Sequence, residues 1–293
     1  MRILVTGALG QLGRELLEQL DAAGTHDVLA TDAVAGPDDP ATALDITDRD
    51  AVLGAVTASE PDCIVHPAAL TAVDRCETEV DLAYRINAIG TRHVAEAARR
   101  VGAHVLYVST DYVFDGTKAE PYLEWDTPNP QSVYGASKLA GERELDPGST
   151  VVRTSWVCGR YGQNMVKTIL RVAESNPELA FVDDQRGHPT FAQDLATMIV
   201  RLVTERRPGT FHVTNQGAVS WYEFARAVLE AAGADPDRVR PITTADLDPP
   251  RPAPRPANSV LDNAALRLSG VELLADYHEP LERTVAWIRQ HGG

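Results

Sequence analysis

Short apolar runs alternate with longer stretches of helical periodicity through the first two-thirds of the chain. Amphipathic patterns predict helices over residues 12–23, 79–101, 133–145 and 193–205. Between them lie runs that are apolar throughout rather than at every second position, at residues 2–7, 27–32, 63–68, 104–110, 150–156 and 210–215. Continuous apolar strands are typical of a parallel sheet that helices cover on both faces. The alternation therefore predicts an α/β fold with a doubly wound parallel sheet.

The pattern changes after Cys158 and again after Ser220. Residues 164–178 predict an additional helix, and the end of the chain reads as helix, proline-rich loop and helix. We therefore expect two domains. The larger, formed by residues 1–157 and 188–217, carries the sheet, and the smaller, formed by residues 158–187 and 218–293, lies over its carboxyl edge. The loop DPPRPAPRPANS is either a linker or a binding loop that presents Arg251 and Arg255.

Composition narrows the classes of partner. The 293 residues carry a formal charge of -15, so no excess of cations exists to displace the counterions of a nucleic acid. No stretch approaches the ~20 apolar residues of a membrane span, and no leader pattern precedes the first strand. Cys63, Cys76 and Cys158 form no CxxC pair and are expected to be buried thiols. We expect a cytoplasmic protein with no nucleic-acid and no membrane partner.

A glycine-rich turn joins the first strand to the first helix. In VTGALGQLGREL, glycines recur with the spacing G-x-x-G-x-x-G. Glycines here permit a tight turn and bring a pyrophosphate close to the free N–H groups of the helix N-terminus. A turn without a ligand is the alternative, but strand, turn and helix follow in the required order. We therefore expect a Rossmann-like dinucleotide-binding domain in which the turn contributes Gly7, Gly10, Gln11, Leu12 and Gly13.

The second strand ends in Asp32, about twenty residues beyond the glycine turn. A carboxylate at this point accepts hydrogen bonds from the ribose 2′-hydroxyl and repels a 2′-phosphate, which favours NAD(H). Arg14 could instead reach a 2′-phosphate, and a capping role is the alternative for Asp32. The other cofactor residues that we expect are Asp45 and Ile46, in a short strand predicted at 44–48, and Ala68 and Ala69 at the end of the third strand.

Hydroxyl and basic side chains gather where the fourth strand ends and the next helix begins. Thr110 and Asp111 end that strand, at the edge of the sheet where open α/β folds bind ligands. In the stretch SVYGASK, Ser132 caps a helix on which Tyr134 and Lys138 share one face. An exposed i, i+4 pair is the common alternative. The surrounding residues favour a proton donor beside a cation.

These motifs together resemble the extended short-chain dehydrogenases/reductases and, more narrowly, the dTDP-4-dehydrorhamnose reductases. The matching stretches run in order through nearly the whole chain, among them GALGQLGREL, STDYVFDG, YGASKLAGE, DDQRGHPTFAQDLA and GTFHVTNQGAVSWYEFA. Tyr-x-x-x-Lys is shared by a very large superfamily, whereas STDYVFDG with GHPT and SWYEFA is far more specific. The chain departs from many relatives at His66-Pro67 and at Cys158, which leaves the sugar specificity open.

The resemblance implies that NADPH or NADH reduces the C4 keto group of a dTDP-4-keto-6-deoxyhexose. Tyr134 would be the general acid, and Thr110 would hydrogen-bond the same oxygen. Lys138 would bind the nicotinamide ribose and, together with the positively charged nicotinamide left after hydride transfer, lower the pKa of Tyr134, so that Tyr134 and Lys138 also belong to the cofactor site. Arg255 would bind the diphosphate. The full set of substrate residues implied in this way is Thr71, Val73, Asp111, Trp156, Asn164, Gln185, His188 and Arg255; for Trp156, burial in the core is the alternative.

Two other functions remain open. The same scaffold serves sugar-nucleotide epimerases and reductases of other keto-deoxysugars, and an epimerase would retain NAD⁺ without needing added reductant. Some relatives are non-enzymatic regulatory subunits of methionine adenosyltransferase, although the intact Thr110, Tyr134 and Lys138 favour an enzyme. The resemblance allows a divalent metal, but the sequence has no ligand cluster with metal-site spacing. We expect a monomer or a homodimer.

Overall fold

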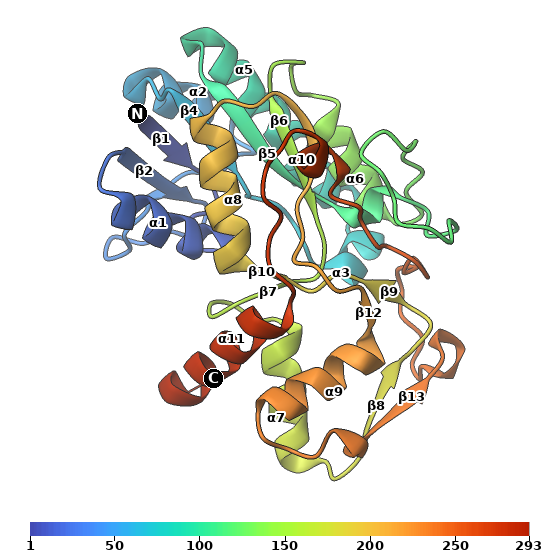
Figure 1. The fold of residues 1–293 in the computed structure, drawn as a ribbon. Helices are drawn as coiled ribbons and strands as arrows, with labels where there is room; N and C mark the ends of the chain where they lie inside the picture. Colours follow the sequence, from blue (N-terminus) through green and yellow to red (C-terminus); the bar gives the residue numbers. More distant parts are fainter. Residues whose placement is uncertain (293) are drawn as a thin grey trace.

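The computed structural model describes residues 1–292 and is built around a sheet of seven strands, in which every neighbouring pair is parallel (Figure 1). The doubly wound fold class is therefore confirmed. All but one of the strands coincide with predicted apolar runs. From one edge to the other they are β11 (Gly209–His212), β6 (Thr150–Thr154), β5 (His104–Thr110), β4 (Cys63–His66), β1 (Arg2–Val5), β2 (Asp27–Asp32) and β3 (Thr42–Ala43).

The edge strand β3 differs from the prediction. It ends at Ala43, and the strand predicted at 44–48 is wrong. The Asp45 side chain accepts the N–H two residues later at 2.8 Å, and the Asp48 side chain caps α2 (Arg49–Ser59). Aspartates that bond neighbouring backbone N–H groups favour turns and helix starts over strands, so the chain leaves the sheet here.

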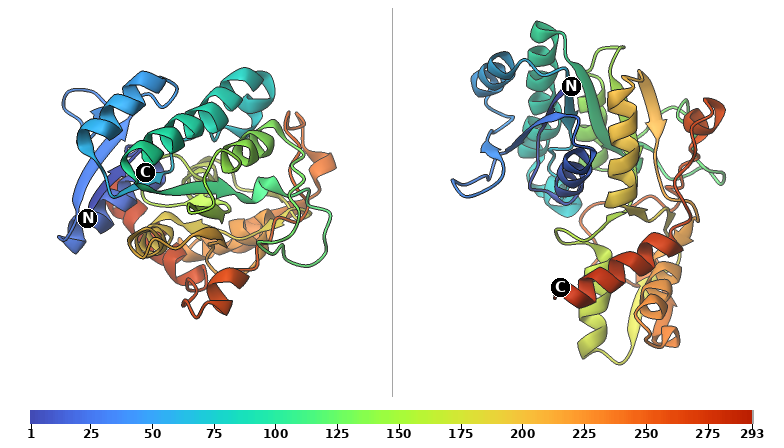
Figure 2. Two further views of the ribbon diagram at one scale, coloured as in Figure 1. Left: turned by 90° about the horizontal axis from the view of Figure 1, so that it is seen from above. Right: turned by 60° about the vertical axis from the view of Figure 1, so that its left-hand side comes forward.

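Helices cover both faces of the sheet, as the continuous apolar strands require. α1 (Gln11–Ala23) and α8 (Ala192–Thr204) pack together over one face, and α2 packs with α5 (Thr91–Val101) over the other (Figure 2). Ile3 and Leu4 are neighbours in β1 but belong to different core clusters, because successive strand side chains point to opposite faces. The two clusters fix the sheet, and with it the edge where the strands end.

The helix predicted over residues 79–101 is interrupted. It consists of α4 (Val80–Tyr84), a π-helical turn (Arg85–Gly90) and α5. The widened turn holds the fully buried Asn87, whose amide donates to the Leu70 carbonyl at 3.1 Å and to the Ser137 hydroxyl at 3.0 Å. Ser137 lies on α6 (Val133–Glu142), the helix of the Tyr-x-x-x-Lys motif. The π-helical turn therefore packs against α6 and is hydrogen-bonded to it through Asn87.

A second group of elements lies below the sheet in Figure 1. It has a hydrophobic cluster of its own, which includes Phe224, Val228 and Leu281. Its main elements are α7 (Met165–Ser175), α9 (Trp221–Ala231), α11 (His278–His291) and the parallel pair β8 (Leu179–Val182) and β13 (Val239–Ile242). Shorter elements complete the chain: α3 (Val73–Thr78), α10 (Ala264–Leu268), β7 (Val157–Cys158) paired with β10 (Thr190–Phe191), β9 (Arg186–Gly187) paired with β12 (Val219–Ser220), and 3₁₀ turns at Asp111–Val113, Pro236–Arg238 and Thr244–Asp246.

Part of the C-terminal segment returns to the sheet. α10 packs against β11, and Leu266 and Val271 join the core cluster beneath α1 and α8. Limited proteolysis would test the predicted domain limits, which stay a prediction.

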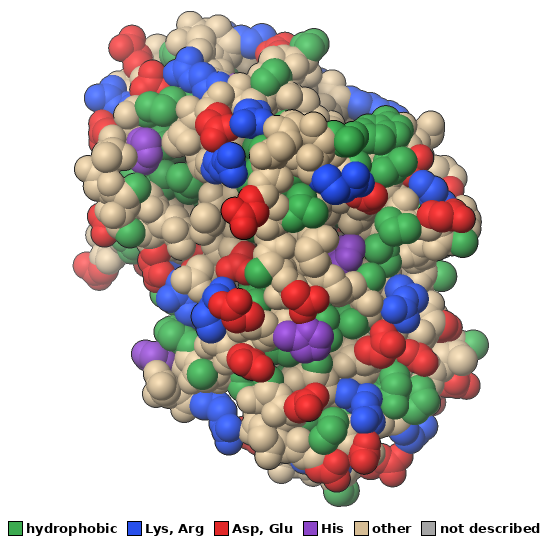
Figure 3. All heavy atoms as spheres, in the orientation of Figure 1, with side chains coloured by type: hydrophobic (Ala, Val, Ile, Leu, Met, Phe, Trp, Pro, Cys, Tyr) green, Lys and Arg blue, Asp and Glu red, His purple; other side chains and the backbone are tan. Residues whose placement is uncertain are grey.

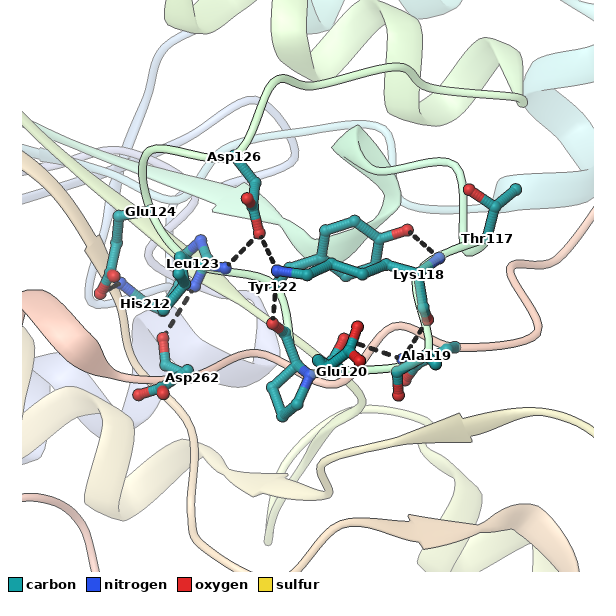
Figure 4. Close-up of polar contacts among 12 residues, drawn as sticks. Thr117, Lys118, Ala119, Glu120, Tyr122, Leu123, Glu124, Asp126, His212 and Asp262 are labelled. Carbon is teal, nitrogen blue, oxygen red and sulfur yellow. Dashed lines mark hydrogen bonds and ion pairs between the residues drawn. The ribbon is translucent and has the colours of Figure 1, made fainter.

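A long loop, residues 114–131, connects β5 to α6 and is fixed by polar contacts (Figure 4). Lys118 Nζ pairs with the Asp126 carboxylate at 2.6 Å within the loop. The Glu124 carboxylate accepts the backbone N–H of His212, the last residue of β11, at 3.1 Å. The loop is thereby tied to the edge of the sheet, and it leads into the helix that carries Tyr134.

The surface of this acidic chain carries side chains of both charges. Acidic and basic side chains are interspersed over the face in Figure 3, and many arginines are paired, as Arg92 is with Glu144 at 2.7 Å. Exposed pairs of this kind stabilise a protein by only about 0–1 kcal/mol each. Within residues 1–292, no helix is long and apolar enough to cross a membrane. The three cysteine thiols are free and buried, as predicted.

Candidate active site

A cavity of ≈ 660 Å³ opens at the carboxyl ends of the sheet strands. Ligands of doubly wound sheets bind at this edge. Every residue predicted for the cofactor or for catalysis lines the cavity: Gly7, Gly10, Gln11, Leu12, Gly13, Asp32, Asp45, Ile46, Ala68, Ala69, Thr110, Tyr134 and Lys138. The structure thus brings these residues together, while the role of each one stays a prediction.

The glycine turn is shaped by close backbone approach. Gly7 has φ +59°, and a Cβ atom on it would lie 2.8 Å from the Cα of Ala68. A Cβ atom on Gly13 would lie 2.2 Å from the Gly7 carbonyl oxygen. Side chains at these two positions would therefore push the turn away from β4 and α1. Because Gly10 provides no side-chain cap, the N–H groups in the first turn of α1 can receive an anion.

Asp32 is held in the cavity wall by the backbone around it. Its Oδ2 accepts the N–H of Leu9 in the glycine turn at 3.0 Å, and its Oδ1 accepts the N–H of Val34 at 3.1 Å. The capping role is therefore present in the structure, and the ribose role stays a prediction. Arg14 donates to the Leu9 carbonyl at 3.1 Å and does not line the cavity. Among the described residues that do, Lys138 is the only lysine or arginine.

The helix of the Tyr-x-x-x-Lys motif begins as predicted, with the Ser132 hydroxyl accepting the N–H of Gly135 at 3.1 Å. Lys138 is 2% exposed, donates to the Val108 carbonyl at 2.7 Å and lies 4.0 Å from the ring centroid of Tyr107. Burial lowers the pKa of Lys138 to about 7. A large share of neutral amine is therefore expected near neutral pH.

The pKa of Tyr134 is set mainly by burial. Desolvation raises the pKa of its hydroxyl, and a hydrogen bond with Thr110 is the largest influence that lowers it. In the chain alone the cost of an anion in the cavity wall dominates, and the expected lowering by Lys138 together with an oxidised nicotinamide stays a prediction. A raised pKa keeps the hydroxyl protonated at neutral pH. Tyr134 is thus able to donate a proton, although it holds that proton more tightly than a free tyrosine.

On the substrate side, Thr71, Val73, Asp111, Trp156 and Asn164 line the cavity, while their contacts with a substrate stay a prediction. Trp156 has a left-handed backbone, with φ +44°, and stacks on Trp221 with ring centroids 3.6 Å apart. It is part-buried in the cavity wall rather than sealed in the core. The sequence analysis did not predict Trp221 as a cavity residue. The available signal was the motif SWYEFA, in which Ser220 caps α9 and Trp221 is the first residue of that helix.

Asn164 has a structural role that the prediction did not include. Its Oδ1 accepts the N–H of Lys167 and caps α7, while its Nδ2 donates to Gln11 Oε1 at 2.8 Å. Gln11 in turn donates to the Val157 carbonyl at 3.0 Å. Gln11, predicted to bind the cofactor, and Asn164, predicted to bind the substrate, are therefore hydrogen-bonded to each other in the cavity wall. Such a link joins the glycine turn to the smaller group of elements.

The structure does not bring Gln185, His188 and Arg255 into the cavity. Gln185 donates to the Thr244 hydroxyl at 2.9 Å, and burial lowers the pKa of His188 to about 4. Arg255 donates to both carboxylate oxygens of Asp74, at 2.5 and 2.9 Å. It lines a separate pocket of ≈ 200 Å³ that shares Tyr112 with the main cavity. The predicted contact of Arg255 with a diphosphate therefore requires a rearrangement.

Of the three residues that depart from the family pattern, one is buried away from the cavity and two line it. The His66 ring is fully buried, with its nitrogens 2.7 Å from the Thr6 hydroxyl and 3.2 Å from the Thr91 hydroxyl. Pro67 and Cys158 line the cavity. Any effect on sugar specificity therefore belongs to these two. Over the described part of the chain, no group of three or more His, Cys, Asp or Glu side chains could hold a metal ion.

Comparison with known proteins gives consistent relatives. A family model described as the RmlD substrate binding domain matches residues 1–289. The dTDP-4-dehydrorhamnose reductase of Aggregatibacter actinomycetemcomitans is 43% identical over 275 residues, which are 89% of this chain and 90% of that protein. The spore coat polysaccharide biosynthesis protein SpsK of Bacillus subtilis is 41% identical over 273 residues, 92% of each chain. The crystal structure of dTDP-4-dehydrorhamnose reductase from Bacillus anthracis in complex with NADP has a TM-score of 0.90 at 41% identity, covering 97% of this chain and 98% of that one.

A doubly wound sheet with a glycine turn and a Thr, Tyr and Lys set at its carboxyl edge defines an NAD(P)H-dependent oxidoreductase of the short-chain dehydrogenase/reductase class. The relatives narrow this class further. The chain belongs to the RmlD substrate binding domain family, that of the dTDP-4-dehydrorhamnose reductases. The resemblance seen in the sequence motifs is confirmed.

Proposed function

We propose that the protein is a dTDP-4-dehydrorhamnose reductase. It reduces the C4 keto group of a dTDP-4-keto-6-deoxyhexose to give dTDP-L-rhamnose, with NADPH or NADH as reductant. The observation that carries this proposal is the meeting of Thr110, Tyr134 and Lys138 in one cavity with the glycine turn, in a chain of this family.

The side chains divide the chemistry among themselves. A nicotinamide cofactor supplies the hydride when it is bound. The N-terminus of α1 holds its pyrophosphate, and Lys138 orients its nicotinamide ribose. Tyr134 gives a proton to the C4 oxygen as the negative charge develops there, and Thr110 donates a hydrogen bond to the same oxygen. The stacked Trp156 and Trp221 form a flat apolar wall beside the sugar ring.

The setting of the enzyme is also part of the proposal. Three free thiols suit a reducing compartment, which supports a cytoplasmic protein. The formal charge of -15 disfavours a nucleic-acid partner. We propose a monomer or a homodimer, which sedimentation of the purified protein would distinguish.

The decisive experiment supplies dTDP-4-keto-6-deoxyhexose with NADH or NADPH, follows the loss of reduced-cofactor absorbance, and identifies the sugar product. We expect stoichiometric oxidation of the cofactor and dTDP-L-rhamnose as product. An epimerase would carry bound NAD⁺ and interconvert the sugar with no change in added reductant. A regulatory subunit would show no turnover at all. Reduction to a different 6-deoxyhexose would assign the alternative, a reductase of another dTDP-4-keto-deoxysugar.

A further inference from the structure

Asp111 is a buried carboxyl group directly behind a predicted catalytic hydroxyl. It is 2% exposed, and its Oδ2 has no hydrogen-bond partner among the described residues. Its Oδ1 accepts the hydroxyl proton of Thr110 at 2.9 Å. Thr110 Oγ1 in turn accepts the backbone N–H of Tyr112 at 3.2 Å. Although Asp111 lines the cavity, its unpartnered oxygen is out of contact with solvent, so a sugar hydroxyl does not reach it without rearrangement.

The Thr110 hydroxyl has a single hydrogen. Asp111 and the substrate oxygen compete for it, and the Tyr134 hydroxyl is a further partner of Thr110 in the same cavity. When Asp111 is a carboxylate, a charge-assisted bond draws this hydrogen toward Asp111 and away from the substrate oxygen. When Asp111 is protonated, the carboxylic acid donates to Thr110 Oγ1. The Thr110 hydrogen is then free to point at the C4 oxygen, where negative charge develops during reduction.

We propose that Asp111 is a positioning residue whose proton sets the direction of the Thr110 hydroxyl, so that reduction is fastest when Asp111 is neutral. The inference rests on the proposed function, because it concerns stabilisation of a carbonyl oxygen in this cavity. It adds a residue that acts through Thr110 rather than by touching substrate.

The groups around Asp111 act on its pKa in opposing directions, and burial is the largest influence. Burial raises the pKa of Asp111 to about 6, and hydrogen bonds from Ser259 and Thr110 are the main influences that lower it. In the structure the Ser259 hydroxyl instead donates to the carbonyl of Arg186 at 3.3 Å, and the unpartnered Asp111 oxygen receives no bond from it. Titratable groups face the site from three other elements: Tyr134 on α6, Asp74 and Cys76 on α3, and Arg255 in the proline-rich loop behind Tyr112.

An ionised Asp111 also opposes the chemistry directly. Its charge raises the pKa of Tyr134, so the phenol gives up its proton less readily. A carboxylate next to the reacting carbonyl would repel the oxygen as it becomes negative. Loss of the Asp111 proton therefore weakens both the Thr110 bond and the Tyr134 acid.

The test is the pH profile of kcat/KM for the sugar nucleotide, with saturating cofactor. For the natural chain we expect a decrease of up to about tenfold per pH unit above the pKa of Asp111, until the residual activity of the ionised form is reached. Asp111→Asn should remove the contribution of Asp111 to this limb, because the amide N–H can donate to Thr110 at every pH, and leave only a limb from Lys138, whose pKa is about 7. Thr110→Val removes the hydroxyl through which Asp111 acts and should make the limb smaller.

A matched control is Asp115→Asn, four residues along the chain. Asp115 accepts the Tyr122 hydroxyl at 2.7 Å and does not contact Thr110, so the limb should remain. A limb that persists at the same pH in Asp111→Asn overturns the proposal. If Asp111→Asn does not fold, as judged by circular dichroism, a limb of unchanged size in Thr110→Val overturns it instead. Absence of reduction by the natural chain at every pH would refute the proposed function, a result distinct from either of these.

Discussion

The cofactor side and the substrate side of the cavity are held together in different ways. The cofactor side begins in one strand, turn and helix that are consecutive in the chain, and the close approach of Gly7 and Gly13 to other backbone atoms fixes its shape. The substrate side is assembled from distant segments through pairs of side chains. Trp156 stacks on Trp221, and Arg255 binds Asp74 across 181 positions of sequence.

This difference bears on how each side responds to change. A backbone turn has no alternative partner, so the glycine turn presents the same N–H groups whatever the substrate. Paired side chains can exchange partners, as Arg255 could exchange the Asp74 carboxylate for a phosphate of similar geometry. The substrate side can therefore change its contacts without a change of backbone, whereas the cofactor side cannot.

The largest effect on turnover is expected at Tyr134, which we assign to both the cofactor site and the reacting carbonyl. Tyr134→Phe should lower kcat by roughly 10²–10⁴-fold, the contribution typical of general acid catalysis, because the proton donor is lost. The dissociation constant for NADH, measured by fluorescence, should change little. The matched control is Tyr112→Phe, which removes a hydroxyl from the neighbouring ring 5.6 Å away. Similar losses in both variants would show that the cavity needs both hydroxyls and would remove the special role of Tyr134.

The same contrast decides how much the sequence alone could predict. The glycine turn, Asp32 and the Tyr134 helix follow local rules of strand, turn and capping, and all of them line the cavity. Trp221, Gln185 and His188 lie in segments whose positions depend on packing between elements far apart in the chain. Neither periodicity nor motif spacing contains that information. Even where a residue was predicted correctly, its hydrogen-bond partner could not be. The bond between Asn164 and Gln11, for example, joins residues 153 positions apart in the sequence.

The next largest effect tests the substrate side. Arg255→Ala should raise KM for the sugar nucleotide about tenfold or more, the effect of losing a charge-assisted hydrogen bond of ~1.5–3 kcal/mol, without changing the affinity for cofactor. Arg255→Lys should restore only part of the loss, because lysine lacks the planar fork. Steady-state kinetics with varied sugar nucleotide gives both values.

The variant Asp74→Asn distinguishes two roles of Arg255, binding of the diphosphate and attachment of the proline-rich loop to α3. If Arg255 exchanges Asp74 for phosphate, removal of the Asp74 charge frees the guanidinium and should leave KM unchanged or lower it. If the pair only fastens the proline-rich loop to α3, Asp74→Asn and Arg255→Ala should raise KM alike. That result would assign the diphosphate to another cation, such as Arg251 or Lys167, and would confine Arg255 to a structural role.

The smallest effect is expected on the cofactor side, where Asp32 sets the preference between two reductants. Asp32→Asn removes a negative charge near the 2′ position of the ribose and should shift the ratio of kcat/KM for NADPH to that for NADH upward by about fivefold. This corresponds to a single charge contact of about 1 kcal/mol. Asp32→Ala should shift the ratio in the same direction but also lower both values, because the Leu9 N–H loses its acceptor. Neither variant should alter KM for the sugar nucleotide. An unchanged ratio in both would mean that Asp32 acts only as a cap of the glycine turn, and that the preference originates elsewhere on this side of the cavity.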